Sequence, residues 1–191
     1  MNKTIDDLYQ EIYSDLELPQ GLSENIVTWR CFAPDDVPPS QVMIIGEAPG
    51  QGEDKMGIPF VGRSGKLLDT IIRDLHEHSV YITNLVKQRP PNNRPPTEDE
   101  ISFYLPYVIR EIEVVNPKII LLCGQTAYTA ILSIKDRISD VRGQFFTMGG
   151  YKFMPIFHPS YLLRNHSDKI GSPRWLTEMD IEKVKRELDN E

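Results

Sequence analysis

The chain has 191 residues, of which 40% are hydrophobic and 26% charged, a composition typical of a single globular domain. No apolar run approaches the ~20 residues that span a bilayer, and the acidic N-terminus is not a signal or transit peptide. We therefore expect a cytoplasmic protein without a membrane anchor. Two cysteines supply neither a disulfide framework nor metal-site spacing, and the net charge of −7 argues against a generic nucleic-acid binder.

Apolar patterning predicts the elements of the first half of the chain. A helix is expected to begin at Thr4, and the proline-rich residues 19–40 indicate irregular structure. Residues 41–46 and 79–84 are short apolar runs typical of buried parallel strands. Between them, Ser64 is expected to cap a helix.

In the second half of the chain, predicted helices and strands again alternate. A capping box opens a helix over 97–115, and the apolar run 118–124 predicts a third strand, followed by a helix over 124–132. Residues 141–157 indicate a hairpin whose second limb joins the sheet, and a last helix covers about 173–188. This alternation predicts an α/β sandwich with a mainly parallel sheet.

Four loops follow the predicted strands. They are residues 46–63, 84–96, 124–126 and 158–164. Ligands of such sheets bind beyond the carboxyl ends of the strands, and three of these loops are rich in polar residues, proline and glycine. We therefore predict a site where the four loops converge.

The first loop combines glycines with three carboxylates: Glu47, Glu53 and Asp54. A glycine-rich loop between a strand and a helix suggests a phosphate cradle. The P-loop motif fails because Phe60 stands where it requires glycine and Leu67 where it requires serine or threonine. The dinucleotide fingerprint also fails, and three carboxylates would repel a polyphosphate.

Carboxylates suit a substrate that develops positive charge. Cleavage of a glycosidic bond passes through an oxocarbenium-like transition state, which a carboxylate stabilises. Phe60 offers a flat face to an aromatic base, and the amide of Asn84 can read a base edge. Each residue also has a structural interpretation: Glu47 as a loop cap, Phe60 as a core residue and Asn84 as part of an Asx-turn.

Four motifs together resemble the uracil-DNA glycosylase superfamily, most closely its family 4. They are GEAPGQGED, GIPFVGRSG, YITNLVKQRPPNNRPPT and FHPSYLLR, in the order and spacing of that family. The match covers 41–176, the motif-bearing core of a single domain 1–191 in which 1–40 form an N-terminal extension. The resemblance implies a three-layer α/β/α sandwich with a central four-stranded, mainly parallel sheet, and removal of uracil from DNA.

The resemblance also implies how the base is recognised. The uracil nucleotide would be flipped out of the helix, and Phe60 would stack on it. Asn84 would bind the pairing edge and exclude cytosine, while Glu53 would crowd the position of a thymine methyl group. The main chain of Ala48 would bind another edge of the base.

Further roles follow from the same resemblance. Glu47 would position water or offset positive charge on the sugar, and His158 would donate to a uracil oxygen as the base departs. Ser160 would bind a phosphate, while Tyr161 and Leu162 belong to a loop that would insert an apolar wedge into the duplex. Packing of Leu162 and Leu163 beneath this loop is the alternative.

Phosphate contacts are expected from five basic residues: Arg63, Lys87, Arg89, Arg94 and Arg164. Residues 1–40 carry eight acidic and two basic side chains, whereas 41–167 have a net charge of +1. A basic face is therefore compatible with the negative total. Each of these residues could equally be a solvated surface charge.

The chain departs from the family at its iron–sulfur cluster. The resemblance implies four cysteine ligands, but Gln88 and Tyr104 occupy two of those positions. Two cysteines cannot supply four thiolates, so we expect no cluster, and an apolar plug of Phe103 and Tyr104 in its place. We also expect a monomer that binds uracil-containing DNA and hydrolyses its glycosidic bond without a metal. The alternatives are a non-catalytic DNA-binding or accessory protein and a hydrolase of free nucleosides.

Overall fold

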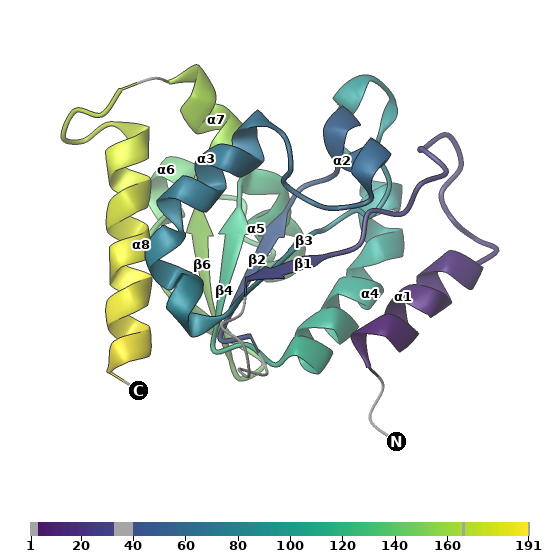
Figure 1. Ribbon diagram of the computed structural model, residues 1–191, viewed down its shortest axis with the longest axis horizontal. Helices are drawn as coiled ribbons and strands as arrows, with labels where there is room; N and C mark the ends of the chain where they lie inside the picture. Colours follow the sequence, from purple (N-terminus) through teal and green to yellow (C-terminus); the bar gives the residue numbers. More distant parts are fainter. Residues whose placement is uncertain (1–3, 33–39, 166, 191) are drawn as a thin grey trace.

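A computed structural model describes residues 4–32, 40–165 and 167–190. Within these ranges, six strands form one sheet in the order β1-β3-β2-β4-β6-β5 (Figure 1). The strands are β1 (Arg30–Phe32), β2 (Val42–Gly46), β3 (Val80–Asn84), β4 (Ile119–Cys123), β5 (Phe146–Met148) and β6 (Tyr151–Ile156).

The four central strands are parallel, and the two edge strands are antiparallel to their neighbours. The expected mainly parallel sheet is confirmed, but its expected number of four strands is wrong. The additional strands are β1 and β5, of three residues each, which are only partly buried. Strand β5 belongs to the first limb of the expected hairpin and pairs with β6 in the sheet. Strand β1 is too short to show alternation and lies within residues 19–40, which were expected to be irregular. Of that segment, 33–39 fall outside the described residues.

Helices cover both faces of the sheet. They are α1 (Ile5–Ser14), α2 (Gln51–Met56), α3 (Arg63–Ile71), α4 (Glu98–Val115), α5 (Gln125–Leu132), α6 (Ile138–Val141), α7 (Pro159–Arg164) and α8 (Pro173–Asp189), with 3₁₀ turns η1 (Arg73–His78) and η2 (Pro91–Asn93). Helices α3 and α8 share one core with the sheet, and α4 and α5 share another on the opposite face. Helix α1 packs outside α4 (Figure 1). The predicted three-layer α/β/α sandwich is confirmed.

Strands β2, β3 and β4 owe their largely apolar sequences to this double cover, because every residue in them is buried, including the polar Thr83 and Asn84 at the end of β3. The capping boxes at Thr4 and Thr97 both form, as the sequence predicts. Within the described residues, no helix has the length and apolar character that crossing a membrane requires.

Three local expectations need correction. Helix α3 starts at Arg63 with Gly62 as its N-cap, so Ser64 does not cap it. The loop after β2 contains the short helix α2, and residues 159–164 form helix α7 instead of a loop. In α7 the proline at the first position supplies a fixed φ where no backbone donor is needed.

Candidate active site

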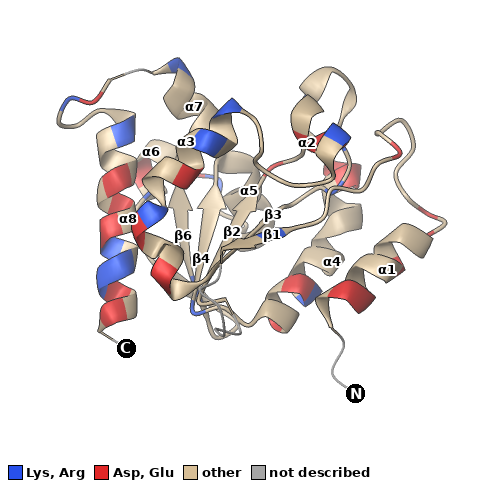
Figure 2. Cartoon of the chain, in the orientation of Figure 1, with Lys and Arg blue, Asp and Glu red and all other residues tan. Residues whose placement is uncertain are grey.

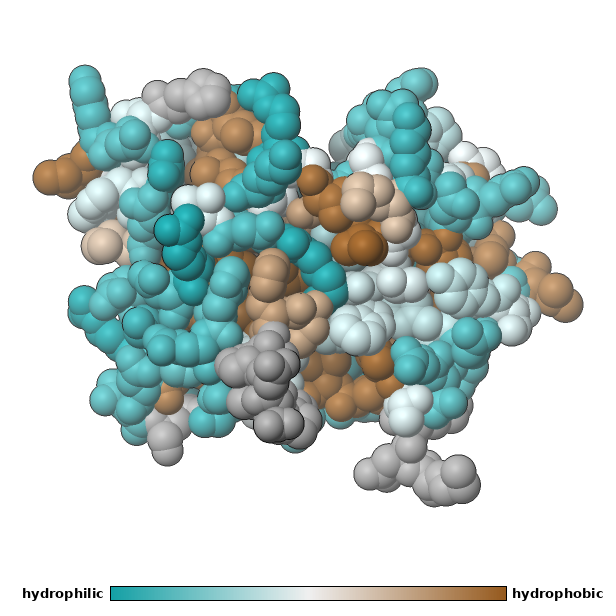
Figure 3. Space-filling model, in the orientation of Figure 1, coloured by the Kyte–Doolittle hydropathy of each residue, from teal (hydrophilic) through white to brown (hydrophobic). Residues whose placement is uncertain are grey.

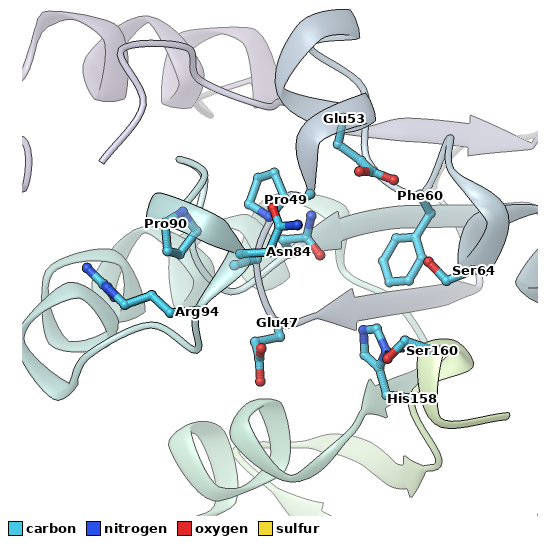
Figure 4. A pocket seen from close by; sticks show the side chains of 13 residues that line it. Glu47, Pro49, Glu53, Phe60, Ser64, Asn84, Pro90, Arg94, His158 and Ser160 are labelled. Carbon is cyan, nitrogen blue, oxygen red and sulfur yellow. Dashed lines mark hydrogen bonds between the residues drawn. The ribbon is translucent and has the colours of Figure 1, made fainter. Parts of the chain in front are cut away.

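A cavity of about 280 Å³ opens at the carboxyl ends of the parallel strands (Figure 4). Figure 3 shows the surface notched there, between the part that carries α2 and the part that carries α3 and α7. The cavity is lined by Glu47, Ala48, Pro49, Gly50, Glu53, Phe60, Ser64, Asn84, Pro90, Asn93, Arg94, His158 and Ser160. All six residues expected to bind or cleave the substrate therefore lie around one cavity. The sequence assigned no site role to Pro49, Gly50, Ser64, Pro90 or Asn93.

Strand register brings the base-reading amide to the cavity. Asn84 ends β3 directly beside Gly46, which ends β2. A Cβ atom on Gly46 would lie 2.4 Å from Asn84 Oδ1 and 2.5 Å from Phe60 Cζ. Only a glycine at this position lets the amide and the ring approach so closely, which is a signal that the sequence motif alone did not explain.

Phe60 has a backbone conformation that needs support from its neighbours. Its φ is +55°, a region that residues with side chains rarely occupy. The Glu53 carboxylate accepts hydrogen bonds from the backbone N–H groups of Val61 (3.1 Å) and Gly62 (3.0 Å). A Cβ atom on Gly65 would lie 1.7 Å from the carbonyl oxygen of Phe60. Glu53 and Gly65 thus fix the turn that presents the ring.

His158 is held as a neutral hydrogen-bond donor. Its Nδ1 accepts from the backbone N–H of Ser160 at 3.1 Å, with Ser160 Oγ at 2.8 Å. A backbone N–H can only donate, so Nδ1 is unprotonated and the ring proton resides on Nε2. Burial and the nearby charge of Arg164 lower the pKa of His158 to about 4. The ring lies 6.0 Å from that of Phe60, centroid to centroid.

Glu47 is anchored at both its backbone and its side chain. Its carbonyl oxygen accepts from the N–H of Val86 at 3.0 Å. Its carboxylate accepts from the hydroxyl of Thr126 at 2.5 Å. The sequence placed 124–126 at this edge of the sheet but gave Thr126 no role, since a single threonine carries no motif.

Lys87 is wrongly assigned as a phosphate contact, because its side chain is fully buried. Its Nζ forms an ion pair with Glu111 (2.6 Å) and donates to the Asn84 carbonyl oxygen (2.6 Å). The same carboxylate accepts from the hydroxyls of Tyr9 (2.8 Å) and Tyr81 (2.6 Å). Burial lowers the pKa of Lys87, and the charge of Glu111 opposes this effect. Lys87 supports the end of β3 from beneath.

The expectation that Leu162 belongs to an exposed apolar wedge also needs correction. It is 3% exposed within the core that joins α3, α8 and the sheet, so the packing alternative holds. Tyr161 is 38% exposed and stacks on Phe157 with centroids 5.1 Å apart. The exposed surface of α7 is therefore offered by Tyr161, not by Leu162.

The other basic residues differ in how they are engaged. Arg94 forms two hydrogen bonds with Glu100, at 2.9 and 2.6 Å. Arg89 donates to Asn93 at 2.7 Å. Arg63 and Arg164 are exposed. Figure 2 shows Lys and Arg on α3 and α7 at the edge where the cavity opens.

The residues at the expected cluster position bond to one another. The Tyr104 hydroxyl donates to Gln88 Oε1 at 2.6 Å, and Gln88 Nε2 donates to the Ser23 carbonyl oxygen at 2.7 Å. Tyr104 is fully buried, with Phe103 edge-on against it. The expected apolar plug is present, and a hydrogen-bonded bridge that was not anticipated runs through it.

Neither cysteine lies at that bridge. Cys31 is near Ser40 and Ser79, at the start of β3, whereas Gln88 follows its end. Cys123 is buried in β4, and burial raises its pKa to about 12. Among the described residues, no group of three or more His, Cys, Asp or Glu side chains is arranged to hold a metal ion. The side chains at this position do not fit an iron–sulfur cluster.

Comparison with known proteins supports the same assignment as the fold and the cavity. The family model described as the uracil DNA glycosylase superfamily matches residues 34–184. The chain belongs to this superfamily.

The resemblance to family 4 is confirmed by individual relatives. The chain is 42% identical to the type-4 uracil-DNA glycosylase of Thermotoga maritima, over 80% of each chain. It is 43% identical to the type-4 enzyme of Saccharolobus solfataricus, over 79% of this chain and 73% of that one. A type-5 uracil-DNA glycosylase of Pyrobaculum aerophilum is 29% identical, over 64% and 62%.

Proposed function

We propose that the protein is a uracil-DNA glycosylase, which hydrolyses the bond between uracil and deoxyribose and leaves an abasic site. One observation carries this proposal: Glu47, Phe60, Asn84 and His158 line a single cavity. At about 280 Å³, the cavity is near the lower end of the ~300–1,000 Å³ range of small-molecule pockets, which suits one base.

The base enters this cavity after it is flipped from the strand. The Phe60 ring stacks on it, and the Asn84 amide pairs with its edge, which excludes cytosine because that base exchanges a donor for an acceptor. In this proposal Glu53 obstructs the methyl group that distinguishes thymine from uracil, and the main chain of Ala48 binds another edge. Rejecting thymine needs such an obstacle, because one methyl group changes binding by only ~1–3 kcal/mol.

The reaction breaks the glycosidic bond, and its electron pair leaves with the base. The Nε2–H of neutral His158 donates to the uracil oxygen on which negative charge gathers. The Glu47 carboxylate stabilises positive charge on the sugar and directs water to C1′. Water supplies the hydroxyl group of the abasic sugar, and its proton passes to solvent or to the departing base.

The DNA strand lies across the exposed edge of the cavity. Arg63 and Arg164 contact phosphates directly, and Tyr161 presents its ring where the base has left the stack. Arg89, Arg94 and Ser160 contact phosphates only if they release part of their present hydrogen bonding. We also propose that the protein acts as a monomer in the cytoplasm.

We propose further that neither an iron–sulfur cluster nor a metal ion takes part, because the Gln88–Tyr104 bridge fills the position where the family's cysteines would stand. Uracil release is expected to continue in excess chelator, in protein whose iron content is below one atom per chain. Stoichiometric iron, or loss of release on chelation, would contradict this part.

An oligonucleotide with a single uracil tests the function directly. Incubation followed by alkali should cut the strand at that position, and a strand with thymine or cytosine there should remain intact. Glu47→Ala should slow single-turnover cleavage about 10²–10⁴-fold while the Kd for DNA stays unchanged. Binding of uracil-DNA without strand cleavage by the unaltered protein would favour a non-catalytic DNA-binding role.

A further inference from the structure

Thr126 touches the cavity's carboxylate from outside the cavity. Its hydroxyl donates to Glu47 Oε2 at 2.5 Å, although Thr126 is not among the lining residues. The hydrogen bond joins the loop after β2 to helix α5, across 79 residues of sequence. A short bond between a neutral hydroxyl and a carboxylate is one of the stronger kinds in proteins.

The fold brings these groups together. Strand β2 pairs with β4 in parallel, so the residues that follow them emerge at the same edge of the sheet. Gly124 opens α5 with φ +86° and provides no side-chain cap, and Thr126 is the second residue of the helix. A β-branched side chain in a helix has few χ1 rotamers, and the amino end of a helix favours a negative charge nearby.

The hydrogen bond also sets the direction of the carboxylate. In Figure 4 the Glu47 side chain points away from the Asn84 amide. The Glu47 carboxylate thus lies away from the edge of the cavity that reads the base. Under the proposed function, the sugar of a bound nucleotide would lie on the Glu47 side.

We propose that Thr126 is a positioning residue for Glu47: its hydroxyl occupies one carboxylate oxygen and turns the other toward the sugar and the attacking water. This rests on the proposed function. Without the hydroxyl, the carboxylate keeps its charge but rotates among several orientations, and only some of these face C1′.

Two substitutions at Thr126 separate the hydroxyl from the shape of the side chain. Thr126→Val has nearly the same shape and cannot donate, whereas Thr126→Ser keeps the donor. Single-turnover release of uracil should fall about tenfold in Thr126→Val, the effect of one charge-assisted hydrogen bond, with the Kd for DNA unchanged. Thr126→Ser should retain most of the rate.

Thr129→Val is the matched control on the same helix. Its hydroxyl donates to the Ile134 carbonyl oxygen instead of a cavity residue, so uracil release should be unchanged. A double-mutant cycle tests the route of the effect. Adding Thr126→Val to Glu47→Ala should cause no further loss, because the group that Thr126 positions is already absent.

A readout that needs no activity separates this proposal from the proposed function. The carboxyl ¹³C resonance of Glu47, assigned with Glu47→Gln, should move in Thr126→Val and stay in place in Thr126→Ser and Thr129→Val. If neither the unaltered protein nor any variant released uracil, but the Glu47 resonance moved as expected, the proposed function would be refuted. The hydrogen bond between Thr126 and Glu47 would still stand. An unchanged resonance, an unchanged or faster rate in Thr126→Val, or a further loss in the double variant would overturn the positioning role.

Discussion

The end of β3 and the residues that follow it face two regions whose side chains serve different purposes. Asn84 lies on the cavity, whereas Lys87 and Gln88 turn toward α4 and are buried against it. On the cavity side, every residue type that the chemistry calls for is present. On the α4 side, a bridge of Gln88 and Tyr104 stands where the family resemblance places metal ligands.

Different constraints act on the cavity and on the region that supports it. A base edge, a leaving anion and a sugar cation each need a specific group at a specific place. Support beneath a loop needs only filled volume and satisfied polar groups, which several sets of side chains can supply. The supporting region can therefore be rebuilt while the cavity keeps its residues.

The largest expected effect is on the supporting region. Lys87→Met removes the cation from a fully buried Glu111, which should lower the free energy of unfolding by about 3–5 kcal/mol in urea denaturation. Adding Glu111→Leu should restore part of the loss, because no buried charge then lacks a partner, while the buried hydroxyl of Tyr81 loses its acceptor. A loss below about 1 kcal/mol in the single variant would show that this pair is not a main support.

On the cavity side, we expect a substitution to lower the rate of uracil release. In Gly46→Ala the new methyl group would displace the Asn84 amide and the Phe60 ring, so single-turnover uracil release should fall about 10²-fold. Gly52→Ala is the control, because outside its own helix the closest atom to the new methyl group would be Val61 Cγ2 at 3.9 Å. Equal activity in the two variants would contradict the close packing around Gly46.

A smaller loss of stability should show that the bond between Gln88 and Tyr104 supports the fold and takes no part in the reaction. Tyr104→Phe leaves the buried side-chain amide oxygen of Gln88 (Oε1) without its donor, which should cost about 1–3 kcal/mol of unfolding free energy. Uracil release at 25 °C should remain, because the bridge does not line the cavity. Tyr107→Phe is the control, since its hydroxyl bonds the poorly buried Asp15; it should cost less. If folded Tyr104→Phe lost its activity, the cavity would depend on the bridge, and the two regions would not be independent.

The last effect concerns pH. The pKa of His158 is about 4 in the folded chain and returns toward ~6.5 on unfolding. The unfolded chain alone binds this proton between those values, so the stability contribution is complete above pH ~6.5 and is lost as pH falls toward 4. The unfolding free energy of the unaltered protein, relative to His158→Gln, should decline over this interval. A constant difference would show that His158 is not buried as a neutral ring.

Sequence patterning predicted the layers of the fold because β2, β3 and β4 are covered on both sides and are mostly apolar. It predicted β5 as the first limb of a hairpin but not as a strand of the sheet, and it missed β1, whose three residues are partly exposed. It also missed α2 and α7, which are too short for periodicity. The family resemblance carried by the four motifs predicted which residues would line the cavity. It could not separate Lys87 from the exposed cations or Leu162 from Tyr161, because burial at a single position depends on packing from distant elements. Thr126 and the Gln88–Tyr104 bond were out of reach for the same reason.

A crystal structure of the protein with uracil tests the central claim most directly. We predict the ring stacked on Phe60, its pairing edge against the Asn84 amide and a carbonyl oxygen within hydrogen-bond distance of His158 Nε2. Uracil bound elsewhere, or a cavity that stays empty at saturating uracil while side chains close it, would contradict the account.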